Sequence, residues 1–187
     1  VENFQVPLEK RFFRQLESSL QKTATQRIEA IALGRGNTGT AQQFLILKNV
    51  GLVYKPDLVV QMFLTANDVK NNSMVLQKDP YLPYFRLNPN GHLEQITHQK
   101  RTGRKLAKIK DTIKEIRIVE LLLSTRQKIS DARDARTADY PLDYHIYDEA
   151  YSQEYQEAWE VTKKLITESR NTAEASGAKY VLVMLSN

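Results

Sequence analysis

Two short polar segments carry the residue types from which a reactive site can be built. Residues 34–39 read Gly-Arg-Gly-Asn-Thr-Gly and stand between an apolar run and a stretch that favours a helix. Residues 65–68 read Thr-Ala-Asn-Asp and follow a second, longer apolar run. A glycine-rich turn that leads into a helix directs backbone N–H groups outward, and the amide of Asn67 adds a side-chain donor. Donors from both segments, aimed at one point, would make an oxyanion hole.

The same glycine segment admits a different chemistry. Its pattern is that of the GxGxxG fingerprint, which binds a dinucleotide when it lies between a strand and a helix. An acidic residue that binds the ribose is expected about 20 residues after the glycines. Asp68, however, comes 29 residues after Gly39. A nucleotide-binding module is therefore an alternative to the oxyanion hole.

Nucleophiles and metal ligands are scarce in this chain. It has no cysteine, which excludes disulfides, thiolate zinc sites, iron–sulfur clusters and cysteine nucleophiles. Its three histidines are His92, His98 and His145. His92 falls in a predicted turn, and the sequence assigns no carboxylate partner to the other two. We therefore expect no metal site and no bound cofactor.

Charge is unevenly distributed along the chain. Lys and Arg total 27 and Asp and Glu total 22, for a net charge of +5. Residues 100–136 hold twelve bases against five acids, whereas residues 139–174 hold nine acids against three bases. Complementary helix faces explain this pattern best, so no nucleic acid is expected. The alternative is a module that binds an anionic polymer through the basic helix. Its surface would consist of Lys100, Arg101, Arg104, Lys105 and Lys108.

Three apolar runs predict the strands that must position the two polar segments. They cover residues 28–33, 58–64 and 180–185. The run at 58–64 does not alternate with polar residues, which is typical of a parallel strand covered on both faces. The polar segments directly follow the first two runs, so we expect them side by side at the carboxyl ends of these strands. No apolar run reaches 18 residues, so this segment is not expected to span a membrane.

Helices and a surface excursion complete the predicted domain. Apolar side chains recur every four residues over 7–22, which predicts an amphipathic helix, and further helices are expected from Thr40 and from Tyr151. Residues 80–148 are expected to leave the sheet as a hairpin followed by a basic helix, forming a lid or a partner surface. Residues 1–187 as a whole are interpreted as a single, partial α/β domain with a mainly parallel sheet.

The residues around the polar segments resemble a known family. The SGNH, or GDSL-type, ester hydrolases carry a Gly-Asp-Ser block after their first strand, a glycine block after the second and a Gly-x-Asn-Asp block after the third. Residues 33–42 are similar to the glycine block, and residues 54–60 are similar to the lead into the third strand. Asn67 and Asp68 fall on the third block, and residues 6–10 resemble the segment after the nucleophile block in one branch of the family.

The resemblance implies a fold and a set of site residues. The fold is a three-layer α/β/α arrangement with a flavodoxin-like sheet of strand order 2-1-3-4-5, whose first strand is missing from this chain. The implied oxyanion-hole residues are Asn67, Gly36 and Asn37, supported by Asp68, Gly34 and Gly39. This chain departs from the pattern at Thr65, which replaces a glycine, and at Asn37, which stands where the family has its oxyanion-hole glycine.

The resemblance also implies acyl transfer from an ester. Neither Gly-Asp-Ser nor a terminal Asp-x-x-His occurs in the chain, so nucleophile and base are expected outside it, and the 187 residues alone are expected to be inactive. The implied substrate is a small-molecule or carbohydrate ester, with water or a sugar hydroxyl as acceptor. No oligomeric state and no localisation are predicted.

Overall fold

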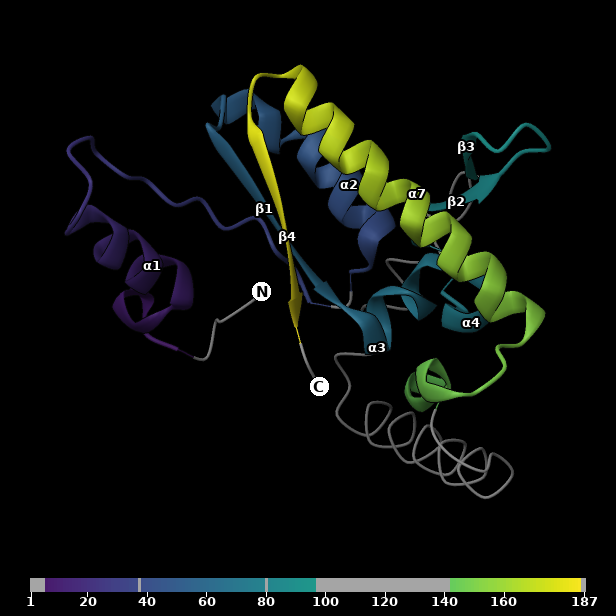
Figure 1. The fold of residues 1–187 in the computed structure, drawn as a ribbon. Helices are drawn as coiled ribbons and strands as arrows, with labels where there is room; N and C mark the ends of the chain where they lie inside the picture. Colours follow the sequence, from purple (N-terminus) through teal and green to yellow (C-terminus); the bar gives the residue numbers. More distant parts are fainter. Residues whose placement is uncertain (1–5, 37, 80, 97–141, 186–187) are drawn as a thin grey trace, which may run out of the picture.

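The computed structural model describes residues 6–36, 38–79, 81–96 and 142–185 (Figure 1). In these residues helices are combined with two small sheets, one a parallel pair of strands and the other an antiparallel pair. The mixed α/β character expected from the sequence is confirmed. No helix in this part of the chain is both long and apolar enough to cross a membrane.

The parallel pair consists of β1 (Leu58–Leu64) and β4 (Lys179–Leu185). The two strands pair along their whole length, from Leu58 opposite Lys179 to Leu64 opposite Leu185. Both are the strands predicted from apolar runs, and the parallel direction predicted for β1 is confirmed. Because the strands are parallel, their carboxyl ends lie at the same edge of the sheet, where the chain continues from β1 into Thr65.

Two helices cover one face of this pair. α2 (Thr40–Asn49) and α7 (Gln153–Ala175) pack against each other along it, as Figure 1 shows. Phe63 from β1 meets Trp159 from α7 there, with ring centroids 6.3 Å apart. The buried residues of this core are Phe63, Val69, Ile146, Tyr155 and Ala158. The opposite, outer face carries Leu58, Val60 and Val181, which are 44% to 48% exposed.

Short helical turns connect the longer elements of the core. They are η2 (Gly51–Tyr54), α3 (Thr65–Asp68), η3 (Lys70–Asn72), α4 (Met74–Gln77) and η4 (Leu142–Tyr147). α3 and η3 continue directly from the end of β1. The loop predicted there is therefore a compact pair of turns.

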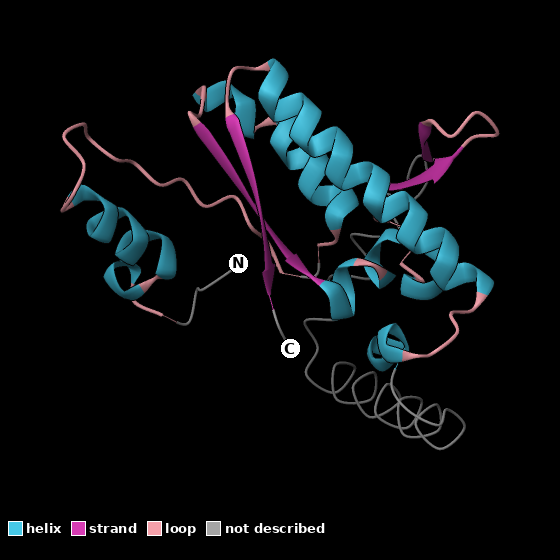
Figure 2. Ribbon diagram, viewed as in Figure 1, coloured by secondary structure: helices cyan, strands magenta, loops and turns pink. Residues whose placement is uncertain are grey.

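Residues 28–33 are not a strand, and that prediction is wrong. They belong to the long loop between α1 and α2 (Figure 2) and join neither sheet. The backbone N–H groups of Ile28 and Ala30 instead donate to Gln21 Oε1 and Glu17 Oε2, each at 2.8 Å. Apolar composition gives a segment strand propensity, but a ladder also needs a neighbouring strand to bond its backbone. Here side chains of α1, in place of a neighbouring strand, accept these hydrogen bonds along one side of the segment.

The predicted hairpin is confirmed. β2 (Tyr84–Leu87) and β3 (Leu93–Ile96) pair antiparallel and form a sheet separate from β1 and β4. Phe85 anchors the hairpin in a second core cluster with residues of α2 and α7. The rest of the predicted excursion, residues 97–141 with the basic helix, lies outside the described residues.

The predicted N-terminal helix is confirmed, with an interruption. η1 (Leu8–Lys10) precedes α1 (Phe12–Gln21), and Arg11 between them has an extended backbone. α1 lies beside the rest of the structure, at the left of Figure 1. Its apolar side chains Phe12, Leu16 and Leu20 are 38% to 45% exposed.

Candidate functional site

The two predicted loops meet at the carboxyl end of β1. A Cβ atom at Gly39 would stand 2.7 Å from Asn71 Cβ and 3.0 Å from the carbonyl oxygen of Asp68, so no side chain fits there. Gly39, at the end of the first loop, therefore lies against the second loop, as predicted. This close packing on the second loop explains why position 39 is occupied by glycine. The prediction that each loop follows a strand holds for residues 65–73 and is wrong for residues 34–40, because residues 28–33 form no strand.

Asn72 joins both loops to α7. Its Oδ1 accepts a 2.8 Å hydrogen bond from the backbone N–H of Ala41, in the first turn of α2. Its Nδ2 donates to Thr162 Oγ1 at 2.7 Å, and that hydroxyl donates to the Ala158 carbonyl oxygen at 2.6 Å. The first N–H groups of a helix have no partner within the helix. Asn72 therefore caps α2 from a distant part of the chain.

A second side chain caps the same helix end. Gln42 Oε1 accepts from the backbone N–H of Gly39 at 2.7 Å, and Gln42 Nε2 donates to the Pro83 carbonyl oxygen at 2.7 Å. The first bond is half of a capping box, in which the residue three positions into the helix reaches back to the cap residue. Gln42 thereby fixes the end of the glycine loop and ties it to the segment before the hairpin.

Asp68 is a buried carboxylate that shapes the second loop. Its Oδ2 accepts from the Leu64 backbone N–H at 2.8 Å, and only 4% of the residue is exposed. Burial raises the pKa of the Asp68 carboxyl to about 6, while hydrogen bonds from Leu64 and from the Gln43 side chain act in the opposite direction. A carboxylate so enclosed is poorly placed to bind a ribose. Its contacts are those of a residue that holds the turn after β1.

Buried polar side chains extend from Asp68 across the covered face of the sheet. Gln61 Nε2 donates to Gln43 Oε1 at 2.9 Å, and the Tyr180 hydroxyl donates to Gln61 Oε1 at 2.6 Å. Burial raises the pKa of Tyr180 to about 12, against a lowering by Arg170. Through Gln43, this chain of hydrogen bonds connects β4 to the loop that carries Asn67.

Several polar atoms in the two loops are buried without a hydrogen-bond partner among the described residues. They are Thr40 Oγ1, Asn67 Oδ1 and Asn71 Nδ2. Leaving such a group unpaired costs about 1 to 3 kcal/mol. Folded proteins keep few of them, and those they keep call for an explanation such as a functional role. Thr40 Oγ1 and Asn71 Nδ2 can donate a hydrogen bond, whereas Asn67 Oδ1 can only accept one. All three atoms belong to the two loops from which the sequence predicts the oxyanion hole.

The other predicted site residues are either exposed or outside the described part of the chain. Gly34 and Gly36 lie in the exposed first part of the glycine loop. Asn37 lies outside the described residues. Of the six predicted residues, the structure brings Gly39 and Asp68 into contact, with Asn67 next to Asp68 in α3. The convergence of Asn67 with Gly36 or Asn37 on one oxygen stays a prediction.

His145 has a carboxylate partner that the sequence did not indicate. Its Nδ1 lies 2.7 Å from Asp148 Oδ2. The turn that carries it, η4, packs against α3, and Ile146 shares a core cluster with Val69. The pair therefore lies at the same end of the fold as Asn67. The only signal in the sequence is a spacing of three residues, which is too common to have identified the pair.

The other two histidines do not join this site. His92 is exposed in the connection between β2 and β3. Its backbone N–H donates to Asn88 Oδ1, as expected of a turn residue. His98 lies outside the described residues. Within those residues, no group of three or more His, Asp or Glu side chains is arranged to hold a metal.

Asn72 and the bonds between Gln61, Gln43 and Tyr180 were not predicted from the sequence. Asn72 stands four residues after Asp68 in a polar stretch, and nothing local marks which Asn of that stretch is buried. Gln61 and Tyr180 lie within apolar runs, where they look like interruptions of a strand. Gln42 alone had a usable signal, because its distance from Gly39 is that of a capping box.

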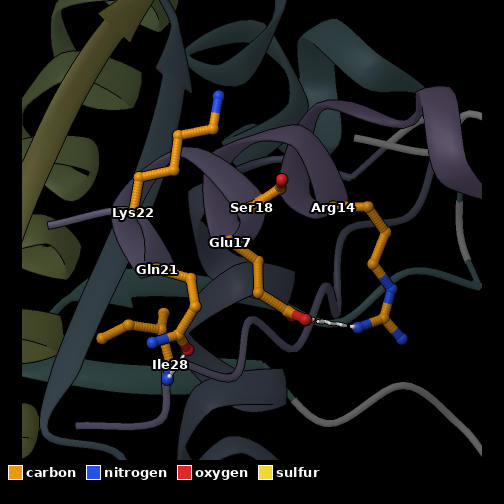
Figure 3. Close-up of a pocket in the computed structure, with 6 residues that line it drawn as sticks. All are labelled: Arg14, Glu17, Ser18, Gln21, Lys22 and Ile28. Atoms are coloured by element: carbon orange, nitrogen blue, oxygen red, sulfur yellow. Dashed lines mark hydrogen bonds and ion pairs between the residues drawn. The ribbon is translucent and has the colours of Figure 1, made fainter. Parts of the chain in front are cut away.

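A shallow pocket of about 330 Å³ lies apart from these loops (Figure 3). Its lining consists of Arg14, Glu17, Ser18, Gln21, Lys22 and Ile28. All but the last belong to α1 or its cap, so none of the predicted site residues contributes to it. The pocket is open, and Glu17 inside it is already paired with Arg14 at 2.9 Å.

The comparisons with known proteins add no relative. No family model, no curated protein and no solved structure matches this chain.

Proposed function

We propose that this chain is part of a serine ester hydrolase of the SGNH type, in which it supplies the loops of the oxyanion hole. The observation that carries the proposal is the packing of Gly39 against Asn71 and Asp68. The two loops that resemble the second and third blocks of that family are thereby in contact. They meet at the carboxyl end of a strand in a parallel pair, which is where open α/β sheets bind ligands.

The proposed reaction is acyl transfer from an ester. A serine attacks the ester carbonyl carbon, a histidine takes the hydroxyl proton, and the alcohol leaves as the tetrahedral intermediate collapses. The negative oxygen of that intermediate accepts hydrogen bonds from the Asn67 amide and from the backbone N–H of Gly36 or Asn37. Water or a carbohydrate hydroxyl then takes the acyl group from the serine. Serine, histidine and its aspartate are contributed by polypeptide outside these residues.

Asp68 has a positioning role in this proposal. Its carboxylate is bonded to the Leu64 N–H and is not available to a substrate. This bond closes the turn from β1 into α3 and so orients Asn67, the residue before it. A positioning role explains why two adjacent polar residues, one buried and one partly accessible, follow the strand.

We also propose that the complete protein has the three-layer α/β/α fold with a larger parallel sheet. Residues 28–33 would become its second strand once a first strand lies between them and β1. Two observations support this. The backbone of residues 28–33 has no strand partner, and β1 has an almost wholly apolar sequence although β4 is its only strand neighbour in the described part of the chain. Such strands are typical of the interior of parallel sheets.

The coding sequence around these residues provides the first test. The proposal expects Gly-Asp-Ser shortly before Val1 and Asp-x-x-His after Asn187. An open reading frame that extends on both sides and contains neither block would refute it. The isolated 187 residues should not hydrolyse p-nitrophenyl acetate faster than their Asn67→Ala variant. Faster hydrolysis that Asn67→Ala abolishes would place a nucleophile inside this chain.

A further inference from the structure

The chain of hydrogen bonds that ends at Asp68 runs in a single direction. The Tyr180 hydroxyl donates to Gln61 Oε1 at 2.6 Å, and Gln61 Nε2 donates to Gln43 Oε1 at 2.9 Å. The Gln43 side chain in turn donates to the Asp68 carboxylate. These bonds connect β4, β1, α2 and α3, four elements that Figure 1 shows in separate parts of the sequence. The turn that carries Asn67 is therefore linked to the amino end of β4.

The two ends of this chain of hydrogen bonds fix its direction. An ionised carboxylate can only accept hydrogen bonds, and the amide nitrogen is the only donor of a glutamine side chain. Asp68 therefore requires Nε2 of Gln43, which leaves Gln43 Oε1 to face Gln61. Gln61 must present its own Nε2 there and its Oε1 to Tyr180, whose hydroxyl supplies the first donor. Turning either amide around would place two donors or two acceptors face to face.

Hydrogen bonds stabilise the ionised form of the buried Asp68. Burial raises the pKa of its carboxyl group to about 6, and the bonds from Leu64 and Gln43 oppose that rise. α3 packs against β1, η3 and η4, and α2 carries Gln43. The titratable side chains described on these elements are Lys48, Lys70, His145 and Tyr147. None of the four is among the causes of the raised pKa. Among the described residues, the carboxylate thus depends on two N–H donors.

We propose that Gln43 is a positioning residue for Asn67, acting through the Asp68 carboxylate. Gln61 and Tyr180 keep the Gln43 amide turned toward that carboxylate. This role rests on the proposed function, in which Asn67 belongs to the oxyanion hole. Asp68 accepts from the backbone at the end of β1 and so closes the turn in which Asn67 precedes it. Without the Gln43 donor, the carboxylate takes up a proton more readily, and the turn loses its fixed acceptor.

Titration of Asp68 tests this contact without any ester. Isotope-labelled aspartate carboxyl groups of the complete polypeptide are followed by NMR as the pH is raised, and Asp68→Asn identifies the Asp68 signal. Gln43→Met keeps the length of the side chain and removes its donor. Asp68 should then titrate about 1 pH unit higher than in wild type, since a hydrogen bond to a charged group shifts such an equilibrium about tenfold or more. An unchanged titration would overturn the proposal.

Val161→Ala is the matched control for a general loss of stability. It removes buried methyl groups from the second core cluster and takes no part in the chain of hydrogen bonds. Asp68 should titrate in this variant as it does in wild type. A rise as large as that in Gln43→Met would show that a weakened core alone moves the titration, and this would overturn the proposal as well.

Ester hydrolysis by the same polypeptide tests the link to Asn67. Gln43→Met should lower kcat for p-nitrophenyl acetate about tenfold with little change in KM, because a slightly misplaced catalytic group reduces the rate steeply. In an Asn67→Ala background, the same substitution should lower kcat by less than about twofold, since the group that Gln43 positions is already absent. Equal factors in the two backgrounds would mean a purely structural role and would overturn the proposal.

These two measurements separate the role of Gln43 from the proposed ester chemistry. An active polypeptide in which Gln43→Met keeps the wild-type kcat would overturn the positioning role alone. A polypeptide that hydrolyses no ester would overturn the ester chemistry and the link to Asn67. The titration would still decide whether Gln43 holds the Asp68 carboxylate.

Tyr180→Phe is a milder variant for the case in which Gln43→Met does not fold. It removes one oxygen atom at the far end of the chain of hydrogen bonds. Asp68 should titrate about 0.2 pH unit higher than in wild type, because each bond in such a chain strengthens the next by about 10–30%. A titration that is unchanged or lower in Tyr180→Phe would overturn the proposal.

Discussion

The backbone N–H of Ala41 donates a 2.8 Å hydrogen bond to the side-chain oxygen of Asn72, which is 31 residues further along the chain. This one buried bond fixes the start of α2 to the turns that follow β1. The glycine loop and the Asn67 loop are thus parts of one unit, which also includes Thr162 on α7. A change at Asn72 should consequently affect both loops, although Asn72 belongs to neither of the motifs visible in the sequence.

Asn72→Ala should lower the free energy of unfolding by about 2 to 4 kcal/mol, because it leaves the Ala41 N–H and the Thr162 hydroxyl without their buried partner. Urea unfolding followed by circular dichroism measures this. The matched control is Asn171→Ala on the exposed side of α7, which should change stability by no more than about 0.5 kcal/mol. Equal effects of the two substitutions would mean that the Asn72 bonds do not support the fold.

Gly39→Ala should be far more damaging than Gly51→Ala. A Cβ atom at Gly39 meets Asn71 Cβ at 2.7 Å, whereas at Gly51 the nearest atom is Leu47 Cδ1 at 3.4 Å, an ordinary contact. Relieving the first clash requires the two loops to separate. We expect a loss of about 1 to 3 kcal/mol for Gly39→Ala, typical of overpacking. Hydrogen exchange should become faster in residues 65–73 for this variant alone, and unchanged exchange there would contradict the described packing.

Stability should depend on pH through Asp68. Burial raises its pKa from 3.8 in the unfolded chain to about 6 in the folded one, so the folded state holds the proton more tightly. The contribution of Asp68 to stability is therefore complete below about pH 4 and is lost as the pH rises through about 6. From well below pH 4 to well above pH 6, the free energy of unfolding of the wild-type chain should fall by about 3 kcal/mol relative to Asp68→Asn, which cannot ionise. Urea unfolding at a series of pH values measures the difference, and parallel curves for the two proteins would refute the assignment.

The strands that the sequence identified correctly are those that have a partner in the described chain. Residues 58–64 and 180–185 pair with each other, and their apolar runs suffice to predict them. Residues 28–33 have comparable composition but no neighbouring strand, so composition alone predicts a strand that does not form. A local pattern reports propensity, whereas a β-ladder is a relation between two segments.

The candidate site was predictable only in its main outline. The location of residues 65–73 follows from a general property of parallel sheets once β1 is recognised. Residues 34–40 follow no strand, and their place beside residues 65–73 depends on the packing of Gly39. The bonds that hold the site do not follow, because they join residues far apart in the sequence. Asn72 bonds Ala41 and Thr162, and Tyr180 bonds Gln61 across the sheet. The pairing of His145 with Asp148 is local, but its position beside α3 depends on the packing of Ile146.

The most direct test of the proposed function is the rate of ester hydrolysis by the complete polypeptide that contains these residues, with and without Asn67. Wild type, Asn67→Ala and the control Asn171→Ala are compared on p-nitrophenyl acetate and on an acetylated sugar. The account predicts that Asn67→Ala lowers kcat about 100-fold to 1000-fold with little change in KM, as expected when one oxyanion donor is removed. Asn171→Ala should retain wild-type rates. A complete polypeptide that hydrolyses neither ester, or whose Asn67→Ala variant is as fast as wild type, would contradict the proposal.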